Sequence, residues 1–300
     1  MTAVEIIEVA PRDGLQNEKR LLGTEAKLEL IERAYQAGAR RIEVTSFVHP
    51  ERVPQMADAE AVAAGLTPHD DVVYAALVLN ERGYDRALAA GIREVNTVVI
   101  TTETFSERNQ GMSVAQAVEV VGKIRARAAA DGISVTVTIS AAFGCPFEGE
   151  VPLGTLTRVA TQVAEIAAAE IVLADTIGVA VPTDVEERIA VVREVGALGA
   201  LRVHFHNTRN TAVANTVAAV RSGVTAIDAS LAGIGGCPFA PAATGNVATE
   251  DLVYTLERMG YATGYDLERT IDSARWIAGE LGIEPPGMVA RAGTFPASAA

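Results

Sequence analysis

The strongest constraint on the fold of this 300-residue chain is a regular alternation of short apolar segments with longer, helix-like ones. Several of the short segments are β-branched or alternate in polarity, which is typical of strands. Eight such units at this spacing fit right-handed crossovers and a closed (β/α)8 barrel, whose usual size is ~250 residues. We therefore predict an α/β fold, a TIM barrel, with strands at residues 4–10, 41–47, 72–79, 94–100, 133–140, 170–175, 201–206 and 226–232.

The segments between these strands carry helix signals. Ser113 with Gln116, and Thr183 with Glu186, fit capping boxes that open two of the helices. Two more helices follow the eighth strand, and we predict one domain over residues 1–300, with the barrel at about 4–247 and a C-terminal helical extension at about 248–300. The helices are expected at about 24–37, 81–90, 113–130, 155–168, 183–195, 210–221, 248–259 and 267–281.

The composition narrows the classes of function. The chain is 49% hydrophobic, which is ample for a large core, and its formal charge is −13. An acidic protein lacks the basic surface that nonspecific nucleic-acid binding requires, so we expect no nucleic-acid partner. No apolar run is long enough to span a bilayer, and no signal-peptide pattern opens the chain. The chain also has only two cysteines, which are few for a disulfide scaffold. The sequence therefore predicts a soluble cytoplasmic protein without membrane contact.

Unusual polar residues cluster at the carboxyl ends of the predicted strands, where barrels of this kind perform their chemistry. Any one of them could instead cap a helix or form a salt bridge, but their convergence on one mouth favours an active site. They are Arg12 and Asp13 after the first strand, Glu43, Thr45 and Ser46 on the second, Asp175 and Thr176 at the sixth, His204 and His206 on the seventh, and Asn246 in the loop after the eighth.

A metal site is predicted on the seventh strand. His204 and His206 are separated by one residue, so a strand directs both imidazoles to the same face. Asp13 adds a carboxylate oxygen, and Asn246 could add a carbonyl oxygen. This mixed set of N and O ligands without a thiolate suits Mg²⁺ or Mn²⁺ with open positions for substrate, and Zn²⁺ is a less favoured alternative. The alternative interpretation is two polar histidines, each bonded to a neighbour.

Cys237 lies in a loop with three nearby glycines, Gly233, Gly235 and Gly236. Such a loop suits a thiol that closes over a substrate rather than a structural ligand. The alternative is a small buried residue in a turn.

Several of these stretches resemble the 3-hydroxy-3-methylglutaryl-CoA (HMG-CoA) lyase family. The similarity extends from about residue 4 to 285, and its first and last motifs are the most specific. The matching stretches are VAPRDGLQNEK (9–19), EVTSFVHPERVPQMAD (43–58), GCPFEG (144–149), ADTIGV (174–179), the His204-x-His206 strand and GIGGCPFAPAATGNVATEDLVY (233–254).

The resemblance implies a carbon–carbon lyase that cleaves HMG-CoA, or a close analogue, to acetyl-CoA and acetoacetate or the matching keto acid. It implies that Asp13, His204, His206 and Asn246 hold the metal, which chelates the substrate. Four residues are implied to be catalytic: Arg12 holds the thioester oxygen, Cys237 transfers a proton, Glu43 supports Arg12 or the metal ligands, and Asp175 is the base or orients it. The residues implied to bind substrate are Arg12, Gln16, Ser46, Asn207 and Arg209. Lys19 and Arg20 are candidates for binding the CoA phosphates.

The chain also departs from the family pattern near the predicted acyl pocket. Where the family commonly continues Asp-Thr-Tyr-Gly after the second histidine, this chain has residues 207–210, Asn-Thr-Arg-Asn. Val172 and Ala174 replace Ser and Gly, and Ala242 replaces a Gly. The sequence motifs therefore specify the type of reaction more firmly than they specify the acyl group of the substrate.

Two alternative functions are a Claisen-type transferase that condenses an acyl-CoA with a 2-oxo acid, and a non-catalytic barrel that binds an acyl-CoA. We expect a homo-oligomer.

Overall fold

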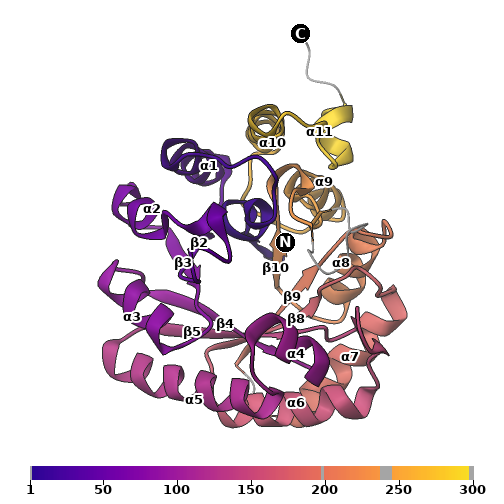
Figure 1. The fold of residues 1–300 in the computed structure, drawn as a ribbon. Coiled ribbons are helices and arrows are strands. Elements are labelled where there is room, and N and C mark those ends of the chain that lie inside the picture. The colour runs from indigo at the N-terminus through magenta and orange to yellow at the C-terminus, as the bar shows by residue number, and fades with distance from the viewer. Residues whose placement is uncertain (1, 197–198, 237–244, 297–300) are drawn as a thin grey trace.

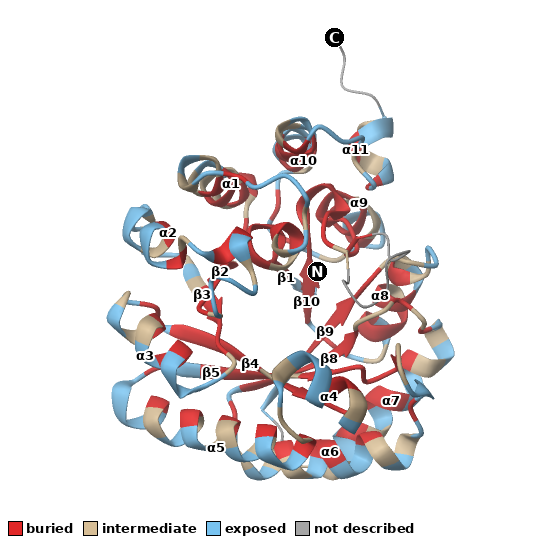
Figure 2. Cartoon of the chain, viewed as in Figure 1, coloured by how far each residue is buried: buried red, intermediate tan, exposed pale blue. Residues whose placement is uncertain are grey.

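The computed structural model describes residues 2–196, 199–236 and 245–296, and its centre is a closed barrel of eight parallel strands (Figure 1). The predicted (β/α)8 fold is confirmed. Helices surround the strands and turn their exposed faces outward, whereas the strands are almost entirely buried (Figure 2). Around the barrel, the strands follow one another as β1 (Glu5–Glu8), β10 (Ala226–Ala229), β9 (Ala200–Phe205), β8 (Glu170–Asp175), β5 (Ser134–Ser140), β4 (Glu94–Ile100), β3 (Val73–Leu77) and β2 (Arg41–Ser46).

Every predicted strand is present, with differences at the ends. The largest shift of a strand end is in the eighth strand, β10, which ends at Ala229 rather than at residue 232. Ser230 instead pairs through its backbone with Val247 and Thr249, and Ala232 takes a left-handed backbone with a φ of 63°. These contacts turn the chain out of the sheet and into the short turn η3 (Leu231–Gly233).

Eight helices form the outer layer of the described structure, one after each barrel strand. The observed α9 follows β10, so it is the eighth helix of the barrel rather than part of an added extension. The helices of this layer are α1 (Thr24–Ala37), α2 (Ala59–Gly65), α3 (Glu81–Ala89), α5 (Val114–Asp131), α6 (Leu153–Glu165), α7 (Pro182–Val195), α8 (Ala212–Arg221) and α9 (Thr249–Arg258).

The sequence did not reveal the shortest elements. Helix α4, for example, reads ETFSERNQ and buries only Phe105 and Ser106, so it lacks an apolar stripe. Helices α10 and α11 extend beyond the barrel, and α10 packs against α1 and α9 (Figure 1). The elements that were not predicted are η1 (Ala10–Gly14), η2 (Pro54–Met56), α2, α4 (Glu103–Gln110), a hairpin of β6 (Gly144–Cys145) and β7 (Gly149–Glu150), and α11 (Met288–Ala292), whereas α10 (Leu267–Leu281) was expected at these bounds.

One predicted capping box is confirmed and the other is wrong. Ser113 Oγ accepts from the amide of Gln116, whose side chain in turn accepts from the amide of Ser113. Helix α7, however, begins at Pro182 rather than after Thr183. A proline is well placed in the first turn because it has no N–H to leave unpaired. Asp184 Oδ2 accepts from the amide of Val181, 3.1 Å away.

Two other predicted helix boundaries shift for backbone reasons. Helix α8 begins at Ala212 rather than at Asn210, because Asn210 takes a left-handed φ of 56° and Asn207 Oδ1 accepts from the amide of Ala212. Helix α6 ends at Glu165 rather than near residue 168, since Ala167 has a φ of 53°. Among the described residues, none of the helices is both long and apolar enough to cross a membrane.

The interior of the barrel contains a network of buried charges below its carboxyl-end mouth. Arg41, at the start of β2, binds Glu94 on β4 and Glu170 on β8, with closest N–O distances of 2.6 and 2.7 Å. Arg202 on β9 continues the network, 3.2 Å from Glu170 and 3.3 Å from Asp228 on β10. The outward-facing residues of β9, by contrast, belong to the hydrophobic core. Successive side chains of β9 point to opposite faces of the sheet, so its outer face is apolar and its inner face is charged.

Replacing Arg41 tests the stability that this network provides. We expect Arg41→Met to reduce the free energy of unfolding by about 3–5 kcal/mol, because it removes the ion-pair partner of the buried Glu94 and leaves Glu170 with Arg202 alone. Urea unfolding followed by circular dichroism measures the change. Arg127→Met is the control, since Arg127 pairs with Asp85 on the surface and should change the midpoint little. Equal midpoints for the two variants would contradict the assigned role of Arg41.

Candidate active site

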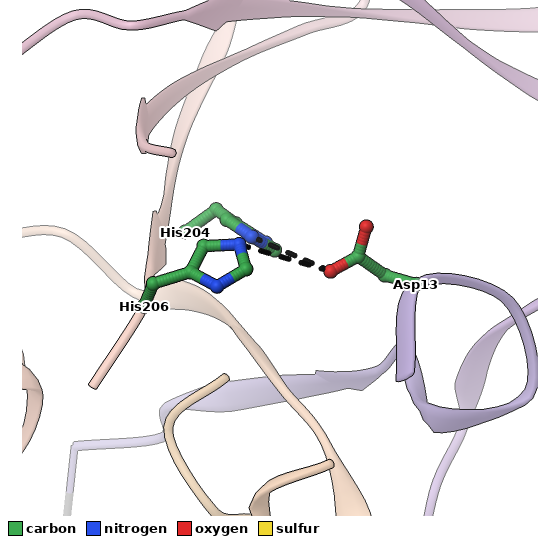
Figure 3. A group of neighbouring side chains, drawn as sticks. All are labelled: Asp13, His204 and His206. Carbon is green, nitrogen blue, oxygen red and sulfur yellow. Dashed lines mark ion pairs between the residues drawn. The ribbon is translucent and has the colours of Figure 1, made fainter. Parts of the chain in front are cut away.

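His204 and His206 lie side by side at the carboxyl end of β9 and face Asp13 (Figure 3). Their ring centroids are 5.1 Å apart, and both side chains are buried. The Nε2 atoms of His204 and His206 lie 3.8 and 3.9 Å from Asp13 Oδ2. One ligand atom from each of the three residues falls within 4.8 Å of the others, a spacing that can hold one metal ion.

The turn η1 carries Asp13 into the mouth of the barrel directly after β1. The amides of Arg12 and Gly14 both bond to the carbonyl of Val9, which folds the chain back tightly. Gly14 is required for close packing, because a Cβ there would lie 2.7 Å from Ser230 Oγ and 2.8 Å from a side-chain carbon of Ile234. The loop after β10 therefore packs directly against the backbone that carries Asp13.

The electrostatic environment favours an ionised aspartate facing a neutral histidine. Burial opposes the charge on Asp13, but Arg12 and the two histidines hold the pKa of its carboxyl well below the usual value. Burial next to His204 lowers the pKa of His206 to about 4. At neutral pH, Asp13 thus offers a negative oxygen and His206 a nitrogen lone pair, which are ligands for a divalent cation.

Asp228 holds the His204 ring in its orientation through a hydrogen bond. His204 Nδ1 lies 3.0 Å from Asp228 Oδ2, and both groups are buried. Despite burial, Arg202 and His204 lower the pKa of Asp228, so this carboxylate accepts and His204 Nδ1 donates. The other ring nitrogen, Nε2, is consequently unprotonated when His204 is neutral and points toward Asp13. Burial opposes protonation of His204, but its bond to Asp228 and the charge of Asp13 raise its pKa.

Arg12 is held by two carboxylates. Its Nε and Nη2 bind Glu43 Oε2 at 2.8 and 2.6 Å, and its Nη1 binds Asp13 Oδ1 at 2.5 Å. Glu43 also accepts from Asn96 Nδ2, 3.3 Å away. The predicted contact between Glu43 and Arg12 is thus present. A guanidinium fixed in this way keeps its positive charge at the mouth of the barrel.

Asn246 reaches the same place from the loop after β10. Its Nδ2 donates to Asp13 Oδ2 at 2.8 Å and to the carbonyl of Ile234 at 3.1 Å. Its Oδ1 is buried and has no hydrogen-bond partner within the described ranges. A rotation of the amide would exchange the two atoms and place this oxygen beside Asp13. Such an orphaned acceptor next to a carboxylate and two imidazoles fits the requirements of a bound divalent cation.

A cavity of about 110 Å³ opens above these residues. Several of its lining residues were not identified from the sequence, although Asn96 with Val98, and Thr138 with Ser140, show the i, i+2 spacing of inward-facing strand positions. The lining residues are Arg12, Asp13, Asn96, Val98, Thr138, Ser140, Ala174, Thr176, His204, His206 and Asp228. The cavity therefore has a charged wall of Arg12, Asp13 and Asp228 and a largely neutral wall from β4, β5 and the end of β8.

Asp175 and Ser46 lie near the mouth, but neither belongs to the lining of this cavity. Both oxygens of Asp175 accept backbone hydrogen bonds, from the amides of Val179 and Ala180 at 3.0 and 2.9 Å. Burial raises the pKa of Asp175 against these bonds. Ser46 is fully buried, and its hydroxyl has no hydrogen-bond partner in the described part of the chain.

Arg12 lines the cavity, but the remaining predicted binding residues lie outside its lining. Arg209 Nη1 donates to the carbonyls of Ile177 and Gly178 and so supports the turn after β8. Gln16 is partly buried, whereas Lys19 and Arg20 are exposed. The remaining candidate, Asn207, accepts from the amide of Ala212 at the start of α8. Cys237 and Ala242 lie outside the described residues.

Comparisons with known proteins agree with this geometry. The HMGL-like family model matches residues 3–277. The chain belongs to the HMGL-like family. It is 42% identical to the (R)-citramalyl-CoA lyase of Chloroflexus aurantiacus over 98% of this chain and 96% of that protein. It is also 39% identical to the hydroxymethylglutaryl-CoA lyase of Bacillus subtilis, over 93% of each chain.

A solved HMG-CoA lyase from Acinetobacter baumannii, in complex with coenzyme A and 3-methylmalate, shares the fold. Its TM-score is 0.94 at 35% identity, over 99% of this chain and 97% of that one. As a member of the HMGL-like family, the chain is a lyase of the kind that cleaves carbon–carbon bonds.

The role of Asp228 can be tested by metal binding. We expect Asp228→Asn to weaken Mn²⁺ affinity by about 10- to 100-fold, because His204 loses the carboxylate that fixes its tautomer and orientation. Isothermal titration calorimetry with Mn²⁺ measures the affinity, and circular dichroism checks folding. Glu94→Gln is the matched control, since Glu94 is a buried carboxylate of the same network that binds Arg41 and no histidine. Equal loss of affinity in both variants would refute an orienting role for Asp228.

Proposed function

We propose that the chain is a divalent-metal-dependent lyase that cleaves the Cα–Cβ bond of a 3-hydroxy-3-methyl acyl-CoA bearing a free carboxylate. HMG-CoA would give acetyl-CoA and acetoacetate, and a shorter analogue would give acetyl-CoA and the matching keto acid. The observation that carries this proposal is the convergence of Asp13, His204 and His206 with a fixed Arg12 at one cavity. Mg²⁺ or Mn²⁺ suits the N and O ligands better than Zn²⁺ does.

Asp13, His204, His206 and Asn246 are the residues proposed to hold the ion. When bound, it supplies Lewis-acid polarisation of the substrate's hydroxyl and an adjacent oxygen, which eases loss of the hydroxyl proton. Asp228 keeps His204 in the orientation required for coordination. The orphaned Oδ1 of Asn246 supports its place in this set.

Arg12 is positioned for the thioester oxygen. Cleavage begins when a base removes the proton of the tertiary hydroxyl, and the Cα–Cβ bonding pair then moves to the thioester as an enolate while the ketone forms. A preorganised positive charge beside the enolate oxygen is worth about 3 kcal/mol in the transition state. Glu43 and Asp13 hold the guanidinium in place before substrate arrives, so little reorganisation is needed.

Two proton-transfer roles complete the proposal. Cys237 would supply the proton that converts the enolate to acetyl-CoA, as the family resemblance implies. Asp175 was expected either to act as the base or to orient it. The two backbone amides bound to its oxygens favour the orienting role, because they hold the turn that begins with Thr176.

A shorter acid is the second candidate for the substrate. The 42% identity to an (R)-citramalyl-CoA lyase is as high as the identities to several hydroxymethylglutaryl-CoA lyases. Citramalyl-CoA carries its carboxylate directly on the hydroxyl-bearing carbon, so the same bond cleavage would yield pyruvate. The reaction class is common to both substrates.

Turnover assays on both substrates test the proposal. We expect the protein with Mg²⁺ or Mn²⁺ to release acetyl-CoA from HMG-CoA or citramalyl-CoA, and mass spectrometry identifies the acetoacetate or pyruvate. EDTA should abolish the activity, and excess Mn²⁺ should restore it. Condensation of acetyl-CoA with a 2-oxo acid without cleavage would favour the Claisen-type transferase. Binding of both acyl-CoAs without any reaction would favour a non-catalytic barrel.

Two variants separate metal binding from proton transfer. We expect His206→Ala to lose Mn²⁺ affinity and turnover together, because it removes a ligand. Cys237→Ser should lose turnover with Mn²⁺ still bound, because a hydroxyl is a much weaker acid than a thiol. Calorimetry with Mn²⁺ and an acetyl-CoA assay measure the two effects. Equal loss of Mn²⁺ from both variants would contradict these separate roles.

A further inference from the structure

Resting on the proposed function, we infer that the hydroxyl pair Ser140–Thr176 shares one spare proton, and that this proton binds the substrate's free carboxylate. Ser140 ends β5 and Thr176 directly follows β8. Both line the cavity at the metal-binding group. Neither residue was assigned to substrate binding from the sequence.

Counting the protons of the pair shows that one is available. Ser140 Oγ and Thr176 Oγ1 lie 2.8 Å apart, so one of the two hydroxyls donates to the other. Thr176 Oγ1 also accepts from the amide of Ala141 at 2.9 Å. Two O–H groups therefore form one mutual bond, and in either direction one O–H has no acceptor among the described residues. Because both hydroxyls line the cavity, a ligand there is the natural acceptor.

The neighbouring hydroxyl cannot serve in the same way. Thr138 Oγ1 donates to Asn96 Oδ1 at 2.9 Å, and Asn96 Nδ2 donates to Glu43. The proton of Thr138 is thus already used, and its oxygen can only accept. Val98 and Ala174 contribute apolar surface to the same wall. Of the three hydroxyls that the described residues place on this wall, only the Ser140–Thr176 pair has a proton to donate.

The free carboxylate is the substrate group that requires this donor. In the proposed reaction, the tertiary hydroxyl lies at Asp13 and the histidines, and the thioester oxygen lies at Arg12. The carboxylate is the oxygen-bearing group left for the opposite wall. Arg12 is the only cationic side chain among the described residues that line the cavity, and Asp13 and Glu43 already bind it. Arg209, also expected to meet a carboxylate, does not line this cavity, and its Nη1 donates to backbone carbonyls.

The shared proton leads to an unusual mutational pattern. In Ser140→Ala, Thr176 still accepts from Ala141 and turns its own proton to the ligand. In Thr176→Val, Ser140 is released from the pair and keeps its proton for the ligand. Each single variant therefore retains one donor, and only the double variant loses it. Hydrogen bonds to a charged group are worth enough to change binding by about 10- to 100-fold.

Binding of matched ligands tests this inference. Calorimetry on the Mn²⁺-loaded protein gives the Kd of the carboxylate substrate that it turns over and of 3-hydroxy-3-methylbutyryl-CoA, which has no free carboxylate on its acyl group. Cys237→Ser serves as the background so that ligands are not consumed. We expect each single variant to reduce the preference for the carboxylate ligand by less than about 3-fold, and the double variant to reduce it by about 10- to 100-fold.

The control is Thr97→Val, which removes a buried hydroxyl of β4 that bonds to the carbonyl of Thr136 and does not line the cavity. It should keep the wild-type preference. Equal loss of affinity for both ligands in the double variant would overturn carboxylate recognition. Full loss of the preference in either single variant would overturn the shared proton. If the wild type neither cleaves nor binds either acyl-CoA, the proposed function fails before this inference is reached.

Discussion

The ion pair between Arg12 and Asp13 is the contact on which the site depends. One carboxylate oxygen of Asp13 meets the guanidinium, and the other faces His204 and His206. The same aspartate therefore joins the proposed enolate-stabilising charge to the proposed metal position. Glu43 holds the opposite side of Arg12, so the guanidinium cannot turn away from the cavity without losing a buried ion pair.

Beneath this contact, buried charges continue through the interior of the barrel. His204 binds Asp228, Asp228 pairs with Arg202, and Arg202 leads through Glu170 to Arg41. Buried ion pairs contribute little net stability compared with well-packed apolar residues, but removing one partner is costly. A barrel interior built in this way fixes the tautomer and position of His204 more firmly than apolar packing would. The network thus couples the stability of the fold to the geometry of the site.

Local patterns in the sequence predicted most of this architecture. All eight strands were expected, because β-branched runs separated by helix-length segments can be recognised in the amino-acid sequence alone. Contacts distant in sequence were harder to predict. Asp228 is one acidic residue within a short apolar strand, and its bond to His204 depends on the register of β10 with β9, which pairs the two residues directly. The hydroxyls of Ser140 and Thr176 become neighbours only when β5 and β8 are adjacent. Arg209 was expected to bind substrate because of its charge, and the sequence did not show that its Nη1 also holds a turn.

The most direct test of the account is to locate Mn²⁺ by anomalous X-ray diffraction from crystals of the metal-loaded protein. The account predicts one strong anomalous peak coordinated by Asp13 Oδ2 and the Nε2 atoms of His204 and His206, with the carbonyl oxygen of Asn246 as a further ligand. No peak at this position under saturating Mn²⁺, or a peak that excludes both histidines, would contradict it.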